Sequence, residues 1–299
     1  MKVWKAITSP WWEVATMRKL LSAGIFSLRK NFIYRIGLLF SVGLAIFAMG
    51  MRWLDVWKHP DIYSKLSAEY SNADGLLFAG GLYLIFSIAA VISLFAGTEV
   101  SVVRNKLVVG HKRSAIFIAG WIVCIFAAVT SYLLYFIAAL GFGGLLIGVT
   151  MPWRDMLLSL IGSCAAVVSF TSILYSLAMT IQSRAIGSVV CLLMTIVMML
   201  AAITVVQKLA APEYRESYTI EDEITGEVIE MPRERNPYYL TGTKRQVYNV
   251  LNNGLPVGQL YQIALNDAEP VSVLAAYDLL LTFICTGVGL MIFRKKDMK

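Results

Sequence analysis

Few side chains in this chain of 299 residues have types and spacings that support chemistry. The most distinctive is one acid, Asp278, which lies inside the apolar run 271–293. An ionisable residue within such a run is by default a candidate functional group. An acid near the end of a run is more often hydrated or hydrogen-bonded locally. Asp278 is therefore a candidate intramembrane polar site, with a purely local role as the competing interpretation.

Metal-ligating and nucleophilic residues show no arrangement typical of a catalytic centre. The histidines are His59 and His111, and the four cysteines form no CxxC pair and no Cys/His cluster. The sequence also lacks GxxxxGK[ST], HExxH and GxSxG motifs, which mark phosphate binding, zinc proteolysis and serine hydrolysis. We predict that the chain is not an enzyme, has no metal or cofactor, and uses its cysteines as small core residues.

A third pattern suggests recognition of another protein. Segment 98–114 carries four Lys/Arg, with Val103, Leu107 and Val108 at helical spacing among them and Gly110 as a stop signal. This pattern predicts a short helix parallel to the membrane whose apolar face docks a partner. The competing interpretation is positive charge that only orients the chain. In either case Glu99 is expected to pair with Arg104 or Arg113.

The elements that position these residues are membrane spans. The chain is 58% hydrophobic and 15% charged, with a mean hydropathy of +0.68, whereas soluble domains are about 45–50% apolar and about 25% charged. This composition excludes an ordinary soluble enzyme. A crossing helix needs about 20 mostly apolar residues. Six runs qualify: 32–51, 76–96, 115–149, 156–181, 186–206 and 271–293.

The distribution of Lys and Arg predicts the orientation of these spans. With the N-terminus inside, the cytoplasmic pieces carry 15 Lys/Arg and three acids, and the outer pieces carry 10 Lys/Arg and 15 acids. The cytoplasmic pieces are 1–31, 98–114, 182–185 and 294–299. We expect a multi-pass protein of a bacterial plasma membrane with both termini in the cytoplasm. The formal charge of +7 then requires no nucleic acid.

Two further segments lie outside the spans. Before the first span, apolar residues recur at helical spacing among basic ones, which predicts an amphipathic helix lying on membrane lipids. Its apolar residues are Met17, Leu21, Ile25 and Leu28. The helix either anchors the chain or also contacts a cytoplasmic partner.

The outer segment 207–270 separates spans 1–5 (32–206) from the sixth span (271–293). We expect a hairpin over 218–231, a helix capped by Thr243, and a second short helix that starts at Val257. This segment either contacts substrate or serves as a scaffold.

The order of these elements resembles that of the permease subunits of ABC-2-type ATP-binding-cassette exporters. RNKLVVGHKRSAIF (104–117) is similar to the RNKL-x-x-G-x-x-R-x-x-I/Y stretch of the Firmicutes-type members, and NPYYLTGTKRQVYNVLNNGLPVGQ (236–259) is similar to their outer segment. Members commonly have an acidic-Gly-Thr turn between GTE and RNK, whereas VSVV (100–103) stands here.

The resemblance implies an all-α integral membrane protein with six transmembrane helices. It also implies an N-terminal amphipathic elbow helix, a cytoplasmic coupling helix and a small α+β extracellular segment between spans five and six. Two permease chains, identical or paralogous, would pair and bind two copies of a cytoplasmic ATPase that holds ATP and Mg. The implied coupling residues are Glu99, Arg104, Asn105, Lys106, Leu107, Gly110 and Arg113.

In this scheme Leu107 supplies the apolar contact with the ATPase, and the elbow helix is a secondary contact. The substrate class expected from related permeases is a peptide antibiotic or an amphipathic drug, in antimicrobial peptide resistance. Two alternatives remain open from the sequence. One is a channel or carrier that works without an ATPase, and the other is a sensor or immunity protein that binds a peptide antibiotic without moving it.

Overall fold

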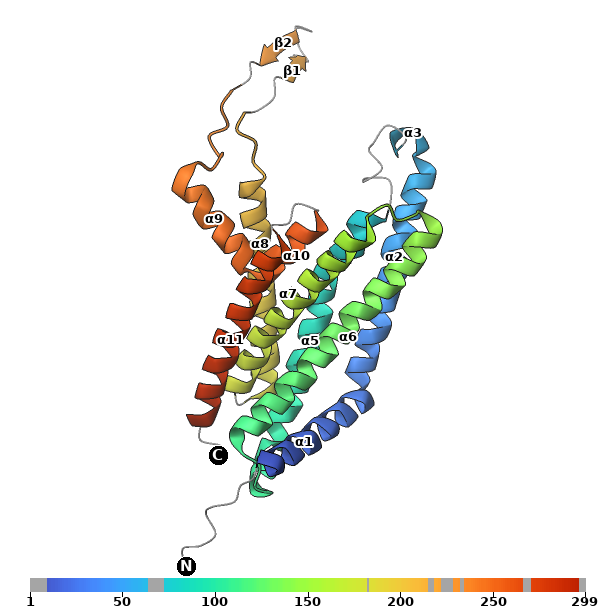
Figure 1. The fold of residues 1–299 in the computed structure, drawn as a ribbon. Helices are drawn as coiled ribbons and strands as arrows, with labels where there is room; N and C mark the ends of the chain where they lie inside the picture. Colours follow the sequence, from blue (N-terminus) through green and yellow to red (C-terminus); the bar gives the residue numbers. More distant parts are fainter. Residues whose placement is uncertain are drawn as a thin grey trace, which may run out of the picture.

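The computed structural model describes residues 10–63, 73–181, 183–214, 218–221, 228–231, 234–265 and 270–295. These residues form a bundle of long helices with a two-stranded hairpin beyond one end (Figure 1). Six helices are long and apolar enough to cross a membrane, which confirms the six predicted runs. They are α2 (Phe32–Lys58), α5 (Asp74–Val108), α6 (Arg113–Leu146), α7 (Trp153–Thr180), α8 (Arg184–Leu209) and α11 (Val271–Lys295).

The two ends of the bundle differ in what they carry (Figure 1). One end holds α1 (Pro10–Lys30), the turn between α5 and α6, and the C-terminal end of α11; we call it the basic end. The opposite end holds α3 (Pro60–Tyr63), the α6–α7 connection, α9 (Gly242–Gly254) and the hairpin; we call it the hairpin end. The connections between consecutive spans therefore lie alternately at the two ends, as the sequence predicts.

Small residues allow the helices to approach closely. This is common in membrane proteins, because helices surrounded by lipid gain no hydrophobic free energy from associating. The Tyr135 ring of α6 occupies the space beside Gly80 of α5, and a Cβ at that glycine would overlap it. A Cβ on Gly289 of α11 would lie 2.7 Å from the Cβ of Ser176 on α7. Helix α5 contacts α2, α6, α7 and α8 and is the central element of the bundle.

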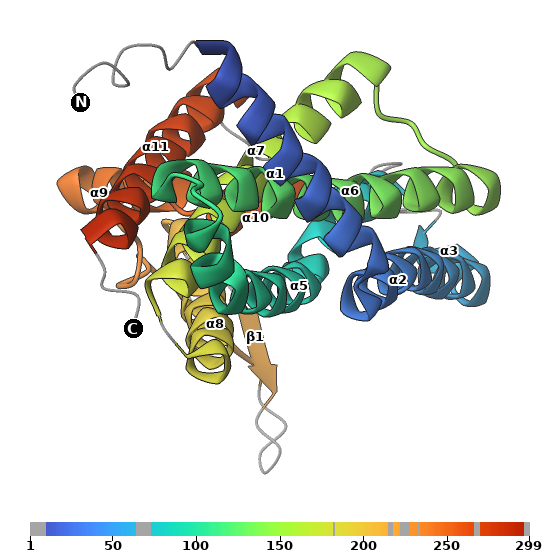
Figure 2. The same cartoon turned by 90° about the horizontal axis from the view of Figure 1, so that it is seen from below.

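Helix α1 lies obliquely across the lower part of α6, as the view from below shows (Figure 2). Asn31 separates it from α2 and caps α2 by accepting a hydrogen bond from the Ile33 N–H at 2.9 Å. The structure therefore has a helix in the segment where the sequence predicts an amphipathic one. A Cβ on its Gly24 would lie 2.7 Å from Val123 of α6, so the helix packs tightly against the bundle.

The expected separate helix parallel to the membrane over 98–114 is absent from the structure. Helix α5 continues as one α-helix of 35 residues through Val108. The physical reason is that VSVV (100–103) contains no glycine or proline, so nothing there interrupts the hydrogen-bonded backbone. The helix ends at Val108, just before the predicted stop signal Gly110, whose φ of 96° is accessible mainly to glycine.

The segment between α8 and α11 contains the predicted hairpin and two short helices. Strands β1 (Tyr218–Glu221) and β2 (Val228–Met231) pair antiparallel, with Tyr218 opposite Met231. Helix α9 has Thr241 as its N-cap, so the prediction of Thr243 was wrong by two residues. Helix α10 (Pro256–Ala264) begins with proline in its first turn and is buried along most of its length. It packs on α5, α7 and α8.

Candidate functional site

Helix α5 and helix α6 meet in a basic turn, residues 104–113, which contains most of the implied coupling residues. The Gly110 N–H donates to the Leu107 carbonyl at 2.9 Å, and the His111 N–H donates to the Lys106 carbonyl at 3.2 Å. These bonds satisfy carbonyls that the end of a helix would otherwise leave unpaired. Arg104 and Asn105 are exposed. The turn is therefore a well-formed, basic projection at the basic end.

Glu99 is buried and forms an ion pair with Lys106, two turns further along α5. The sequence correctly indicated a partnered acid but suggested Arg104 or Arg113 as the partner. Arg113 instead donates from Nη1 to the backbone carbonyl of Arg294 at 3.0 Å. That bond ties the start of α6 to the end of α11, so Glu99, Lys106 and Arg113 stabilise the basic end from within.

Leu107 is half-buried and packs against the chain's own core. The apolar side chains that the turn presents outward are those of Val108 and Val109, which are 82% and 76% exposed. Periodicity placed Leu107 and Val108 on one stripe and did not single out Val109. The exposure of these two valines was predictable only with the position of the helix end and its neighbours.

The four apolar residues of the amphipathic helix are also used within the chain. Leu28 is fully buried, and Met17, Leu21 and Ile25 pack half-buried against the core. Among the described side chains of α1, the large apolar one that is exposed is Phe26, which lies beneath the Lys30 ammonium at 4.2 Å from the ring centroid. A partner contacting α1 in this conformation would meet Phe26 and the basic face.

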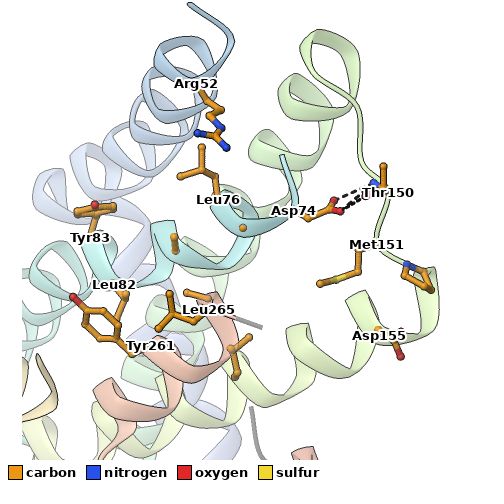
Figure 3. Close-up of a pocket in the computed structure, with 15 residues that line it drawn as sticks. Arg52, Asp74, Leu76, Leu82, Tyr83, Thr150, Met151, Asp155, Tyr261 and Leu265 are labelled. Carbon is orange, nitrogen blue, oxygen red and sulfur yellow. Dashed lines mark hydrogen bonds between the residues drawn. The ribbon is translucent and has the colours of Figure 1, made fainter. Parts of the chain in front are cut away.

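At the hairpin end, α2, α5, α7, α10 and the α6–α7 connection line an open cavity of about 660 Å³ (Figure 3). This volume lies within the range of about 300–1,000 Å³ typical of small-molecule sites. Apolar and polar groups share the lining, as they do in sites for amphipathic ligands. The polar and aromatic side chains in it are Arg52, Asp74, Tyr83, Thr150, Asp155 and Tyr261.

One carboxylate fixes the shape of this cavity. Asp74, at the first turn of α5, accepts hydrogen bonds from the Thr150 N–H at 3.1 and 3.2 Å and from the Thr150 hydroxyl at 2.6 Å (Figure 3). An acid at the N-terminus of a helix is also favoured by the helix dipole. These hydrogen bonds hold the α6–α7 connection against α5, so this connection forms a fixed side of the cavity opening.

The side chain of Asp278 lies inside the bundle and is only 2% exposed. Its Oδ1 accepts a hydrogen bond from the Ser169 hydroxyl of α7 at 2.6 Å, and the side chain of Gln259 from α10 faces the same carboxyl. Asp278 is therefore neither hydrated at a surface nor placed in the cavity. It joins three helices, and its partners lie too far away in sequence for spacing to reveal them.

No group of three or more His, Cys, Asp or Glu side chains suitable for a metal occurs among the described residues. The four cysteines are free thiols, buried or half-buried. In comparisons with known proteins, no family model and no curated protein matches the chain.

Proposed function

We propose that the chain is the membrane-spanning permease subunit of an ABC exporter, which forms the translocation pathway as a dimer and is driven by a separate cytoplasmic ATPase. The proposal rests on the sequence resemblance over 104–117 and 236–259. Six apolar helices preceded by an amphipathic helix support it. With the basic end in the cytoplasm of a bacterial cell, the basic turn is the part that meets the ATPase.

One observation carries the proposal furthest. The basic turn presents two highly exposed valines, Val108 and Val109, beside the exposed Arg104. A loop that only reverses the chain needs no apolar side chains in water, whereas a docking element needs an apolar centre with charges around it. Arg104 suits acidic groups on the partner, and the valines suit an apolar groove.

The cavity at the hairpin end supports a substrate of the amphipathic class. It combines the phenol rings of Tyr83 and Tyr261 with two carboxylates and the single guanidinium of Arg52. The excess of one negative charge favours an apolar ligand that carries a cationic group. The large exposed apolar side chains of α8 suit both lipid and a second permease chain. They include Ile186, Val189, Leu193, Val197 and Leu200.

The test is co-purification of the membrane chain with an ABC ATPase encoded beside its gene. Leu107→Asp would place a charge in the chain's own core, so the informative changes are Val108→Asp and Val109→Asp. Because a carboxylate buried in an apolar contact is poorly compensated, each should lower the affinity at least tenfold, which corresponds to about 1.4 kcal/mol. Val247→Asp, an exposed valine of α9 at the hairpin end, is the matched control.

Reconstitution in liposomes separates the alternatives. The exporter predicts ATP-dependent movement of an amphipathic cationic peptide that requires both subunits. Movement by the chain alone without ATP would favour a channel or carrier. Binding of the peptide without movement, unaffected by removal of the ATPase, would favour a sensor or immunity protein. Full co-purification of the Val108→Asp and Val109→Asp chains would count against docking through the basic turn.

A further inference from the structure

A buried polar contact joins α7, α10 and α11 away from the basic turn and the cavity. Its members are Asp278 of α11, Ser169 of α7 and Gln259 of α10. Gln259 is 1% exposed and Asp278 is 2% exposed. In such surroundings every polar atom is expected to have a hydrogen-bond partner, because leaving one unpaired costs about 1–3 kcal/mol.

The orientation of the Gln259 amide follows from its donors. Its Nε2 donates to the Asn253 carbonyl at 2.7 Å and lies 3.4 Å from the Leu274 carbonyl. Exchanging the nitrogen and oxygen would point an acceptor at these two carbonyls, so this orientation is the favourable one. Its Oε1 then has no donor within the described structure, and neither has Oδ2 of Asp278.

The two buried oxygens without a donor, Oε1 of Gln259 and Oδ2 of Asp278, need a hydrogen-bond donor or a positive charge between them. The ion pairs of Lys106 with Glu99 and of Arg235 with Glu213 do not involve Asp278. Helices α6, α7 and α9 pack on α11, and α10 contributes Gln259. Within the described residues, Ser169 and Gln259 are the side chains that interact with the carboxyl.

The titratable groups on those helices provide no positive charge to the Asp278 carboxyl. Tyr132 of α6 is fully buried and its hydroxyl has no hydrogen-bond partner within the described structure, but a phenol carries no positive charge. Arg245 of α9 stacks over the Tyr239 ring at 5.2 Å. Asp155 of α7 and Tyr261 of α10 line the cavity at the hairpin end. Cys164 of α7 is half-buried and forms no disulfide. None of them supplies the missing positive charge, so an ionised Asp278 would be a buried and uncompensated anion.

We propose that Asp278 is a proton-binding site, occupied at neutral pH, whose Oδ2–H supplies the donor that the contact with Gln259 lacks. A metal cation is the less suitable ligand. Cations such as Ca²⁺ or Mg²⁺ need about six or more oxygens in a space of ionic size, and Asp278, Ser169 and Gln259 do not line the cavity at the hairpin end. A proton needs no space.

This inference goes beyond the proposed function and does not depend on it. Gln259 joins α10 to α11, and the bond between Ser169 and Asp278 joins α11 to α7. The proton at Asp278 therefore stabilises the packing of α10 on α11. Loss of the proton places a negative charge in this contact and weakens it. The position of α10, whose last residues line the cavity, is then linked to pH.

Infrared spectroscopy of the purified full chain in detergent tests the protonation directly, without an ATPase or a substrate. We expect a carboxylic-acid C=O stretching band at neutral pH that is lost in Asp278→Asn. The asparagine keeps a neutral donor at the same position, so it should preserve the fold. In Gln259→Leu the band should move to the higher frequency of a less hydrogen-bonded acid.

A carboxylate signal at neutral pH in place of the acid band would overturn the proposal. An acid band that disappears on addition of a sodium, calcium or magnesium salt at constant pH would overturn it in favour of a cation site. Thermal unfolding gives a second readout. The midpoint of the wild type should fall as the pH rises and Asp278 ionises, and that part of the pH dependence should be absent in Asp278→Asn. Identical pH dependence in both chains would contradict the role of Asp278.

Discussion

At the scale of single residues, Gly110 is the most constrained position of the basic turn. Its φ of 96° disfavours any residue with a Cβ by about 1–2 kcal/mol. Gly110→Ala should therefore lower the midpoint of thermal unfolding in detergent, although no atom lies within 4 Å of the added methyl. Gly75→Ala, in the first turn of α5 with equally open surroundings, is the matched control and should be neutral or stabilising. Equal effects would show that the backbone conformation is not the cause.

The ion pair of Glu99 and Lys106 gives a second prediction at this scale. Glu99→Gln leaves the largely buried Lys106 ammonium without its counter-charge. The loss should be about 2 kcal/mol, below the roughly 3–5 kcal/mol of a fully buried pair, because Lys106 retains some exposure.

The double variant Glu99→Gln with Lys106→Met removes both charges and should recover most of that stability. Denaturation of all four chains completes a double-mutant cycle. Strictly additive losses would argue that the pair makes no net contribution.

The residues of the candidate sites were only partly predictable from the sequence. Gly110 as a stop signal and Glu99 as an acid with a partner follow from local chemistry, although the partner of Glu99 is Lys106 and not the expected arginine. The sequence does not predict that Leu107 packs inward while Val108 and Val109 are exposed, because this depends on which side of α5 the core covers. The partners of Asp278, which are Ser169 and Gln259, lie on other helices and leave no trace in its own neighbourhood.

At the scale of elements, the packing of α7 on α11 depends on Gly289. A Cβ there would lie 2.7 Å from the Ser176 side chain and 3.1 Å from the Phe117 ring. Gly289→Ala should cost about 1–3 kcal/mol by overpacking. Gly287→Ala, two residues away on the same helix with nothing within 4 Å, should be neutral or slightly stabilising. Thermal unfolding of both chains measures the difference, and a harmless Gly289→Ala would mean that the two helices separate easily.

Element boundaries show what sequence patterns specify and what they leave open. Apolar runs gave all six spans because length and hydropathy alone define them. The stripe of Val103 and Leu107 was read as a separate surface helix, yet the same spacing occurs in a continuous α5. A helical period says which residues share a face, and it does not say whether the helix axis turns.

At the scale of the whole molecule, the orientation in the membrane is open to a direct test. The four native cysteines are replaced by alanine, and single cysteines are placed at Lys112 of the basic end and Lys244 of α9 at the hairpin end. A membrane-impermeant maleimide should label the Lys244→Cys chain in intact cells. It should label the Lys112→Cys chain only after the cells are permeabilised. The opposite pattern would reverse the predicted orientation and remove the basic turn from the cytoplasm.

The unbroken course of α5 has a mechanical consequence. Its 35 residues span about 52 Å at 1.5 Å per residue, and the hydrocarbon layer is only about 30 Å thick. One rod therefore begins at Asp74, on the edge of the cavity, and ends at Val108, in the basic turn. The sequence places no proline along it, and the Glu99–Lys106 pair braces its far end. In the proposed permease, a push on the turn would be carried toward the cavity as displacement of one continuous helix.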